Sequence, residues 1–270
     1  MSAYRLTPLD ELEAESIHVF REVVAEFERP VLLYSMGKDS SVLLRLAEKA
    51  FAPTPPPFPV LFIDTTMKFP EAYAFRERVF SKSSLDARVY ENPEGKAQRV
   101  NPRDFTTQQC CAVWKTRGLL GGLASEGVDA AFGGARRDEE RSRNKERIFS
   151  FRDARGQWDP KRQRPELWNL YNTQRRAGET IRVFPLSNWT ELDVWRYVER
   201  EGVEVAPLYF AREREVVVRG GRYLPVSAAF PALPGEEVQR LMTRFRSIGC
   251  VPCSGAVLSS ATNVTEILAE

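Results

Sequence analysis

Short apolar runs alternate with amphipathic segments along most of the chain. The amphipathic segments carry apolar residues at helical spacing and cover residues 9–27, 41–50 and 69–79. The apolar runs have the length of strands and cover residues 31–34, 59–65, 87–90, 129–134 and 181–186. Continuous apolar runs are typical of parallel strands that are buried on both faces. Because strands and helices alternate, the pattern predicts an α/β fold around a parallel sheet.

The second half of the chain is less regular. Residues 149–180 have little periodicity, and their many Arg, Trp, Asn and Pro residues predict a long functional loop. A helix is predicted from residue 187 onward, with Thr190 as its cap and Asp193 three residues on. Beyond residue 205 the pattern predicts β-like or irregular structure, followed by a short helix over residues 236–245. We therefore expect a main domain over residues 1–204 and a C-terminal extension over residues 205–270.

A small polar loop joins the first predicted strand to the helix that follows it. The loop contains Ser35, Gly37, Lys38, Asp39 and Ser40. Loop amides and the first amides of the helix point toward one place, where the helix dipole also favours an anion. The serine hydroxyls add donors, Lys38 adds positive charge, and Gly37 lets the backbone approach a ligand. The spacing of a Walker loop is absent, so the sequence predicts a phosphate site of another kind.

Two further strands end in polar or small residues. Asp64 ends the strand over residues 59–65, and Gly133 and Gly134 end the strand over residues 129–134. Ligands bind at the carboxyl ends of strands in open α/β sheets, so we expect all three residues near the phosphate loop. Asp64 is placed to hold a nucleotide hydroxyl or a metal ion, with a helix cap as the alternative. Arg136 and Arg137 follow the glycine pair, and we expect them to contact phosphate, although charged runs often form solvated helices.

The composition excludes several classes of protein. The 270 residues carry 39 basic and 37 acidic side chains, so the net charge of +2 gives no general attraction to nucleic acid or membrane. No apolar stretch reaches membrane-spanning length, and residues 1–5 open no signal peptide, which predicts a cytoplasmic protein. His18 is the only histidine, and we expect it to have a structural partner in its helix. Histidine-based catalytic triads and histidine-rich metal sites are therefore excluded.

The four cysteines form two clusters, with none left over. Cys110 and Cys111 are adjacent, and Cys250 and Cys253 form a Cys-x-x-Cys motif. Thiolates are the usual ligands of iron–sulfur clusters, and four of them satisfy one [4Fe–4S] cluster. Soft thiolate sites also bind zinc tetrahedrally. The residues alone leave three alternatives: a [4Fe–4S] cluster, which we favour, a zinc site, or unconnected structural cysteines.

The phosphate loop resembles the S-x-G-K-D-S loop of the N-type ATP pyrophosphatases. Residues 132–140 and 164–168 resemble, in addition, the small catalytic subunit of bacterial sulfate adenylyltransferase. The resemblance implies a Rossmann-like parallel sheet of the adenine nucleotide α-hydrolase type. It also implies ATP with Mg²⁺, formation of adenosine 5′-phosphosulfate, and a GTPase large subunit as partner. It assigns catalysis to Lys38, Asp39, Arg136 and Arg137, and ATP binding to Ser35, Gly37, Lys38, Asp39, Ser40, Asp64, Gly133 and Gly134.

The cysteines depart from that family. Where its members have a His-Thr-Asp segment, this chain has Cys110-Cys111-Ala112, and it has a second cysteine near the C-terminus. The four-cysteine pattern resembles that of adenylylsulfate reductases, which holds a [4Fe–4S] cluster. It also resembles the ATP pyrophosphatase component of DNA phosphorothioation systems.

Three functions follow from these resemblances. We expect an ATP pyrophosphatase that adenylylates an acceptor for sulfur incorporation, most simply in DNA phosphorothioation. Its expected partners are a cysteine desulfurase and other sulfur-transfer proteins, with DNA reached through a partner. The alternative is the small subunit of sulfate adenylyltransferase. A reductase is disfavoured because no cysteine remains as a nucleophile if all four hold a cluster. A catalytically inactive paralogue is disfavoured because the loop residues are intact.

Overall fold

The computed structural model of the chain describes residues 6–82, 84–227 and 230–270. Residues 1–5, where we expect no signal peptide, lie outside the described residues. The described chain forms a six-stranded sheet in the order β3-β2-β1-β4-β6-β5 and a four-stranded sheet in the order β10-β9-β7-β8. No helix within the described ranges is long and apolar enough to cross a membrane.

The large sheet is parallel apart from one edge strand, which confirms the predicted α/β fold class. Its strands are β1 (Pro30–Leu33), β2 (Val60–Asp64), β3 (Ala87–Glu91), β4 (Ala130–Phe132), β5 (Phe149–Arg152) and β6 (Thr180–Val183). β5 pairs antiparallel with β6, so the sheet is mixed and not purely parallel as expected. In β5, Phe149 and Phe151 alternate with Ser150 and Arg152. This period of two is a strand signal within the segment that we expected to be one long loop.

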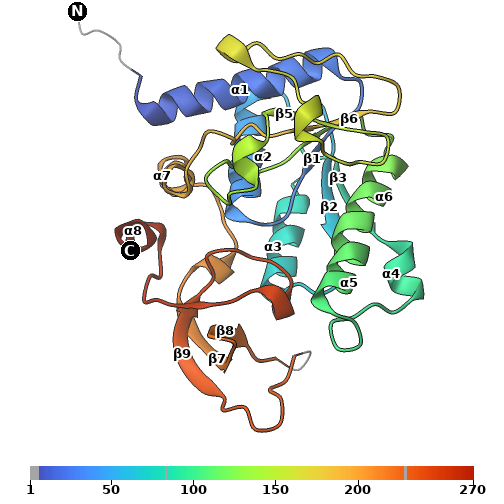
Figure 1. Cartoon of the computed structure of the whole chain (residues 1–270). Coiled ribbons are helices and arrows are strands. Elements are labelled where there is room, and N and C mark those ends of the chain that lie inside the picture. Colours follow the sequence, from blue (N-terminus) through green and yellow to red (C-terminus); the bar gives the residue numbers. More distant parts are fainter. Residues whose placement is uncertain (1–5, 83, 228–229) are drawn as a thin grey trace, which may run out of the picture.

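Helices cover both faces of the large sheet (Figure 1). They are α1 (Pro8–Glu26), α2 (Lys38–Phe51), α3 (Pro70–Phe80), α4 (Pro93–Ala97), α5 (Thr107–Cys111), α6 (Gly118–Ser125), α7 (Glu191–Glu201) and α8 (Val264–Ala269). Alternate strand residues face opposite cores. In β1, Leu32 joins the main core with α1, α2, α3 and α7, whereas Val31 packs with Leu123 of α6 on the other face. The alternation places the loop after β1 between these two layers.

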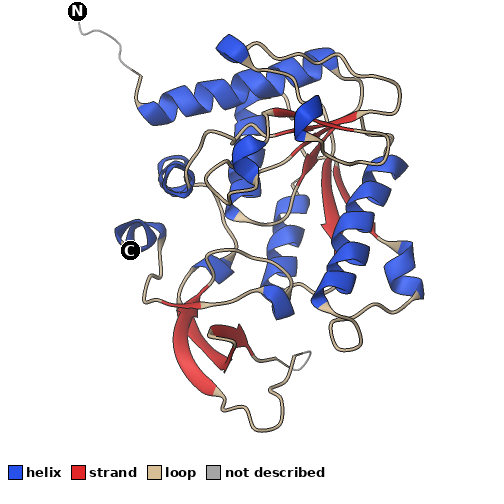
Figure 2. Ribbon diagram, viewed as in Figure 1, coloured by secondary structure: helices blue, strands red, loops and turns tan. Residues whose placement is uncertain are grey.

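The small sheet belongs to the segment that we expected to be an extension. It contains β7 (Arg212–Arg219), β8 (Arg222–Pro225), β9 (Gln239–Arg244) and β10 (Val257–Leu258). Figure 2 shows it at the end of the molecule toward which β2 points. Phe245 and Ile248 from this segment are buried in the main core, which holds the segment against the large sheet.

Two predicted helices differ from the observed structure. The predicted helix over residues 236–245 is wrong, because residues 239–244 form β9 and pair antiparallel with β7. Six residues are too few to separate helical spacing from strand alternation, and pairing with β7 decides between them. Helix α2 begins at Lys38, three residues earlier than predicted, so Lys38 and Asp39 lie in its first turn. Residues 92–109 contain α4 and the start of α5.

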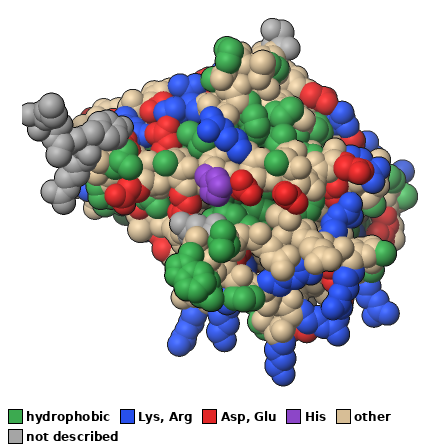
Figure 3. Space-filling view, turned by 90° about the horizontal axis from the view of Figure 1, so that it is seen from above, with side chains coloured by type: hydrophobic (Ala, Val, Ile, Leu, Met, Phe, Trp, Pro, Cys, Tyr) green, Lys and Arg blue, Asp and Glu red, His purple; other side chains and the backbone are tan. Residues whose placement is uncertain are grey.

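The surface charges agree with the balanced composition. Figure 3 shows acidic and basic side chains interspersed over much of one face, with several basic side chains projecting along one edge. His18 lies in α1, and its Nδ1 is 3.8 Å from Glu22 Oε1. Its ring centroid lies 6.1 Å from that of Tyr171. This arrangement agrees with the structural partner that we expected for His18.

Candidate active site

The loop after β1 turns at Met36, whose φ of 66° lies in the left-handed region. Gly37 instead has φ −76° and ψ 158° and is the N-cap of α2. A Cβ at Gly37 would lie 3.3 Å from Ser35 Oγ and 3.4 Å from Tyr209 Oη. Glycine at this position therefore leaves room for Tyr209, while Met36 makes the turn.

The loop is held closed by its own serines. Ser40 Oγ donates to the carbonyl of Gly37 at 2.9 Å and accepts from the amide and the hydroxyl of Ser35, both at 3.2 Å. Ser41 Oγ lies 3.3 Å from Tyr34 Oη on another side of α2. The hydroxyl of Ser40 is thus occupied by the loop, and the first-turn amides of α2 remain without intrahelical acceptors.

Lys38 is buried and directed toward the C-terminal segment. Its amide donates to Tyr209 Oη at 2.7 Å, and its Nζ lies 3.3 Å from the carbonyl oxygen of Arg246 and 3.5 Å from Glu191 Oε1. Burial lowers the pKa of Lys38, and the charge of Glu191 opposes this shift. Lys38 Nζ also lies 3.4 Å from Asp39 Oδ2.

Asp39 joins the loop to the segment after β4. Its Oδ1 forms an ion pair with Arg136, whose side chain is only 4% exposed and whose Nε donates to Asp138 at 3.0 Å. The predicted catalytic residues Lys38, Asp39 and Arg136 therefore form one connected group.

A cavity of about 550 Å³ opens beside this group, at the carboxyl ends of β1, β4 and β6. Among the predicted residues, those that line it are Ser35, Gly37, Asp39, Ser40, Gly133 and Gly134. A Cβ on Gly134 would lie 3.2 Å from Asp39 Cβ and 3.3 Å from its carbonyl carbon. Glycine at this strand end therefore allows β4 to approach the first turn of α2 closely.

Other predicted residues have protein partners outside that lining. Asp64 accepts from the amide of Thr66 at 2.7 Å, from Tyr73 Oη at 2.8 Å and from Arg76 at 3.0 Å. Asp64 lies at the end of β2, as predicted. Its carboxylate binds the start of the segment between β2 and α3 and two side chains of α3. Arg137 contacts the side chain of Asn188, and its Nη2 lies 3.8 Å from Glu166. Binding roles for Asp64 and Arg137 stay predictions.

A short π-helix, Ala112–Arg117, supplies residues that we did not predict for this cavity. Lys115 and Thr116 from this segment line the cavity opposite the loop residues. Single π-helical turns often occur at functional sites, because the extra residue redirects side chains. The Cys-Cys pair precedes this turn directly.

Comparison with known proteins identifies the family of this chain. The family model of the phosphoadenosine phosphosulfate reductase domain matches residues 29–256, which include the large sheet, three strands of the small sheet and the lining of the cavity. The chain belongs to this family. It is 57% identical over 267 residues to "Sulfate adenylyltransferase subunit 2" of Myxococcus xanthus (strain DK1622), with 98% of this chain and 88% of the relative covered. It is 55% identical to the protein of the same name from Caulobacter vibrioides, with 98% and 86% covered.

Solved structures of the same fold are more distant in sequence. A phosphoadenylyl-sulfate reductase from Candida auris, crystallised with phosphate, has a TM-score of 0.52 at 17% identity, covering 77% of this chain and 93% of that chain. The FMN adenylyltransferase of Candida glabrata in complex with ATP has a TM-score of 0.51 at 15% identity, covering 82% and 69%. These likenesses support the adenine nucleotide α-hydrolase type of fold that the resemblance implied.

Three arginines that we did not predict also line the cavity of this family member: Arg143, Arg152 and Arg182. Arg143 and Arg152 share the carboxylate of Glu146, with Arg143 Nη1 at 2.9 Å from Oε2. Arg182 lies in the middle of β6 and is buried. An isolated arginine within an apolar strand pattern carries no motif, so only the folded structure reveals this cluster.

The four cysteines also meet. All four line one very small cavity, although Cys110 and Cys111 are far in sequence from Cys250 and Cys253. Burial raises the pKa of Cys110, and the neighbouring Cys250 raises it further. Lys115 lines both this cavity and the larger one. Within the described ranges, no three His, Cys, Asp or Glu side chains are arranged to hold a metal ion. The thiols converge, therefore, without forming a ready coordination shell.

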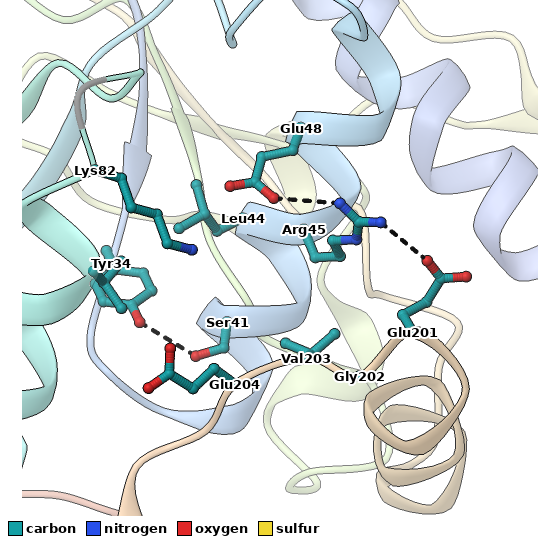
Figure 4. Close-up of a pocket in the computed structure, with 11 residues that line it drawn as sticks. Tyr34, Ser41, Leu44, Arg45, Glu48, Lys82, Glu201, Gly202, Val203 and Glu204 are labelled. Atoms are coloured by element: carbon teal, nitrogen blue, oxygen red, sulfur yellow. Dashed lines mark hydrogen bonds and ion pairs between the residues drawn. The ribbon is translucent and has the colours of Figure 1, made fainter.

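A second cavity on another side of α2 lacks the chemistry of a phosphate site (Figure 4). Its Arg45 is engaged by Glu48 at 3.6 Å and by Glu201 at 3.4 Å. Glu204 also lines it, so its three glutamates outnumber its two cations, Arg45 and Lys82. Such a lining would repel the phosphates of a nucleotide. The cavity at the carboxyl ends of the strands remains the candidate active site.

Proposed function

We propose that this protein is the adenylyltransferase subunit that joins AMP from ATP to sulfate, forming adenosine 5′-phosphosulfate and pyrophosphate. The observation that carries the proposal is that four phosphate-loop residues line one cavity together with the glycines that end β4; the four are Ser35, Gly37, Asp39 and Ser40. The 57% identity with a protein named sulfate adenylyltransferase subunit 2 supports this choice of reaction. It favours the alternative that we expected from the sequence over sulfur incorporation into DNA.

In the proposed reaction, a sulfate oxygen attacks the α-phosphorus of ATP. The bond from that phosphorus to the bridging oxygen of pyrophosphate breaks, and its electron pair leaves with the pyrophosphate. No proton is transferred, so the protein need not supply a general base. Negative charge grows on the leaving group, and preorganised donors lower the barrier by stabilising that charge.

Different residues of the chain would bind the phosphates and position the charged groups around them. The amides of Asp39 and Ser40 in the first turn of α2 would hold the β- and γ-phosphates, with the buried ammonium group of Lys38 adding positive charge behind the loop. Tyr209 accepts from the amide of Lys38 and Glu191 lies beside its ammonium group, so the two residues would hold Lys38 in place. Arg136 would orient Asp39 and place positive charge near the loop.

Mg²⁺ would neutralise the charge of the pyrophosphate when bound with ATP. Carboxylate oxygen is the ligand type that Mg²⁺ prefers, and Asp39 is the loop carboxylate that lines the cavity. Asp39 would therefore hold the ion, with Arg136 paired to the same carboxylate.

The partner and the domain division are part of the same proposal. The relatives are named as subunits, so we infer that this chain works with a large subunit, which the sequence resemblance describes as a GTPase. We also propose that residues 1–204 act as the nucleotide-binding domain and that residues 205–270 act as an extension. Tyr209, Arg246 and the Cys-x-x-Cys motif come from the extension and reach the site.

We further propose a [4Fe–4S] cluster on Cys110, Cys111, Cys250 and Cys253. The donor set fits this group in type and number, and the four side chains already line one cavity. The cluster would fasten the extension to the start of the π-helix. Zinc would fit the same donors less well, because adjacent cysteines constrain a tetrahedral site.

The same four cysteines favour one second candidate, adenylylation of an acceptor for sulfur incorporation. That function would need a cysteine desulfurase as sulfur donor and another acceptor, such as a DNA phosphate. Sulfate would then not stimulate the release of pyrophosphate. The two functions therefore differ in a quantity that one assay measures.

Lys38→Met tests the site assignment that both functions share. We expect ATP cleavage to AMP and pyrophosphate to fall at least 100-fold, because the loop loses its buried cation. Lys96→Met is the matched control, since Lys96 is exposed and pairs with Glu91 away from the cavity. Unchanged turnover of Lys38→Met would remove Lys38 from the site.

A further inference from the structure

Arg182 lies in the middle of β6, on a face of the large sheet that it shares with Arg152 of β5, and both side chains line the cavity. It pairs in register with Ala131 on β4 and Ser150 on β5, so its neighbours on that face are small. Its strand neighbours Ile181 and Val183 face the opposite core. The small neighbours leave the guanidinium a path into the cavity.

The guanidinium of Arg182 is buried but unsatisfied. The residue is 7% exposed, and its Nη1 has no hydrogen-bond partner. Burial, together with the nearby charge of Arg152, lowers the pKa of Arg182 to about 10, and the charge of Glu146 opposes this shift. The side chain still carries its charge at neutral pH. A buried and unpaired charge opposes folding, so its presence is explained if an anion binds there.

The charged side chains around Arg182 carry an excess of positive charge that would balance a dianion. Glu146 is the buried carboxylate of the group, and it already accepts from Arg143, Arg152 and Ser150. Arg143, Arg152 and Arg182 supply three positive charges against this single negative charge. Glu139 lines the cavity and Glu140 lies 3.3 Å from Arg143, but both of these carboxylates are exposed. Without the two exposed carboxylates, the group of three arginines and Glu146 has a net charge of about +2.

We propose that Arg182, with Arg143 and Arg152, forms the subsite for the second substrate, a tetrahedral oxyanion with two negative charges. This inference rests on the proposed function for the identity of that anion, which is sulfate. Arg182 would hydrogen-bond the oxyanion directly, and Arg152 and Arg143 would balance its second charge. The subsite shares its cavity with the phosphate loop, so the bound anion faces the nucleotide.

The α-phosphate of ATP must be distinguished from sulfate as the anion that Arg182 binds. The α-phosphate of ATP could use the same guanidinium, because phosphate and sulfate oxygens present similar acceptors. Loss of an Arg182 contact to sulfate would raise the KM for sulfate, whereas loss of a contact to ATP would raise the KM for ATP. Hydrogen bonds to charged groups predict an increase of roughly 10- to 100-fold.

Thermal unfolding of the full chain tests the subsite without any catalytic activity. Wild type, Arg182→Met and the control Arg162→Met are compared in sodium sulfate and in sodium chloride of equal ionic strength. The series is repeated with Mg²⁺ and α,β-methylene-ATP. Arg162 is a suitable control because its side chain is 76% exposed and pairs with Asp159. The chloride arm and the control remove the general stabilisation that sulfate gives to proteins.

We expect Arg182→Met to unfold at a higher temperature than wild type without sulfate, because a buried unpaired charge is gone. It should also lose the saturable sulfate response that wild type and Arg162→Met show. A lower unfolding temperature of Arg182→Met without sulfate would assign Arg182 a structural role and overturn the proposal. An equal sulfate response in wild type and Arg182→Met would overturn it as well.

Kinetics complete the test. In the formation of adenylylsulfate, Arg182→Met should raise the KM for sulfate 10-fold or more and leave the KM for ATP unchanged. The reverse pattern would overturn the subsite and assign Arg182 to ATP. If wild type forms no adenylylsulfate, the proposed function fails, and the unfolding series alone still decides whether Arg182 binds a dianion.

Discussion

Arg136 forms an ion pair with Asp39, which connects the segment after β4 to the first turn of α2. Arg136 is buried, and Asp39 faces both this arginine and Lys38. The pair therefore aligns two segments that are almost a hundred residues apart in sequence, and both segments border the cavity.

A double-mutant cycle measures this ion pair. Breaking a buried ion pair is costly even though Asp39 keeps Lys38 as a second partner, so Arg136→Met should lower the free energy of unfolding by about 3 kcal/mol. Asp39→Asn should destabilise for the same reason. The double variant should lose less stability than the sum of the two, with a coupling energy of about 1–3 kcal/mol in urea unfolding. Strict additivity would show that the pair does not exist in solution.

Gly134→Ala should disturb the site more than a glycine change elsewhere. The new Cβ would meet Asp39 at 3.2 Å, so β4 and α2 must separate, at a cost of about 1–3 kcal/mol in stability. The affinity for ATP should fall with it, as titration calorimetry would measure. Gly255→Ala is the matched control, because its Cβ would meet only the Arg222 side chain at 3.8 Å. Equal effects of the two substitutions would contradict the close approach.

Glu191 predicts a change of stability in acid. Burial alone would raise its pKa, but the charge of Lys38 and the hydrogen bond from Arg246 outweigh burial and lower the pKa below 4.5. A carboxylate with a lowered pKa stabilises the fold above its ordinary pKa, and this contribution disappears as the pH falls through its folded pKa. Wild type should therefore lose stability more steeply below about pH 4.5 than Glu191→Gln, in urea unfolding measured from pH 7 to pH 3. Parallel curves would refute the role of Glu191.

The cysteine site predicts a coloured protein. Anaerobically purified wild type should contain iron and acid-labile sulfide in the ratio of a [4Fe–4S] cluster. It should also absorb light at about 400 nm. Cys253→Ser should lose most of this iron, because Cys253 lines the shared cavity with the other three cysteines. His18→Ala serves as a control away from that cavity. Colourless wild-type protein that contains zinc would replace the cluster with a zinc site.

The sequence predicted the parts of the fold that local patterns determine. The strand ends and the phosphate loop carry strong local signals, and Ser35, Asp39 and Gly134 line one cavity. The α/β class is confirmed. The family comparisons favour the sulfate reaction, which we had expected only as an alternative, because local motifs define the use of ATP more sharply than they define the acceptor.

Tertiary partners explain what the sequence did not predict. Leu241 and Met242 fit a helix or a strand equally well, and only β7 selects the strand. In the sequence, Arg182 resembles an ordinary polar residue of a half-exposed strand, whereas in the fold it is buried between β4 and β5. Tyr209 reaches the amide of Lys38 from the extension, a contact that no spacing rule could predict.

Sulfate-dependent formation of adenylylsulfate tests the central claim most directly. The chain is incubated with ATP, Mg²⁺, radiolabelled sulfate and inorganic pyrophosphatase, with and without the large subunit of sulfate adenylyltransferase. We predict a labelled adenylylsulfate product that requires both sulfate and ATP and is absent with Lys38→Met. Cleavage of ATP to AMP that does not respond to sulfate, with no labelled product even when the large subunit is present, would contradict the account.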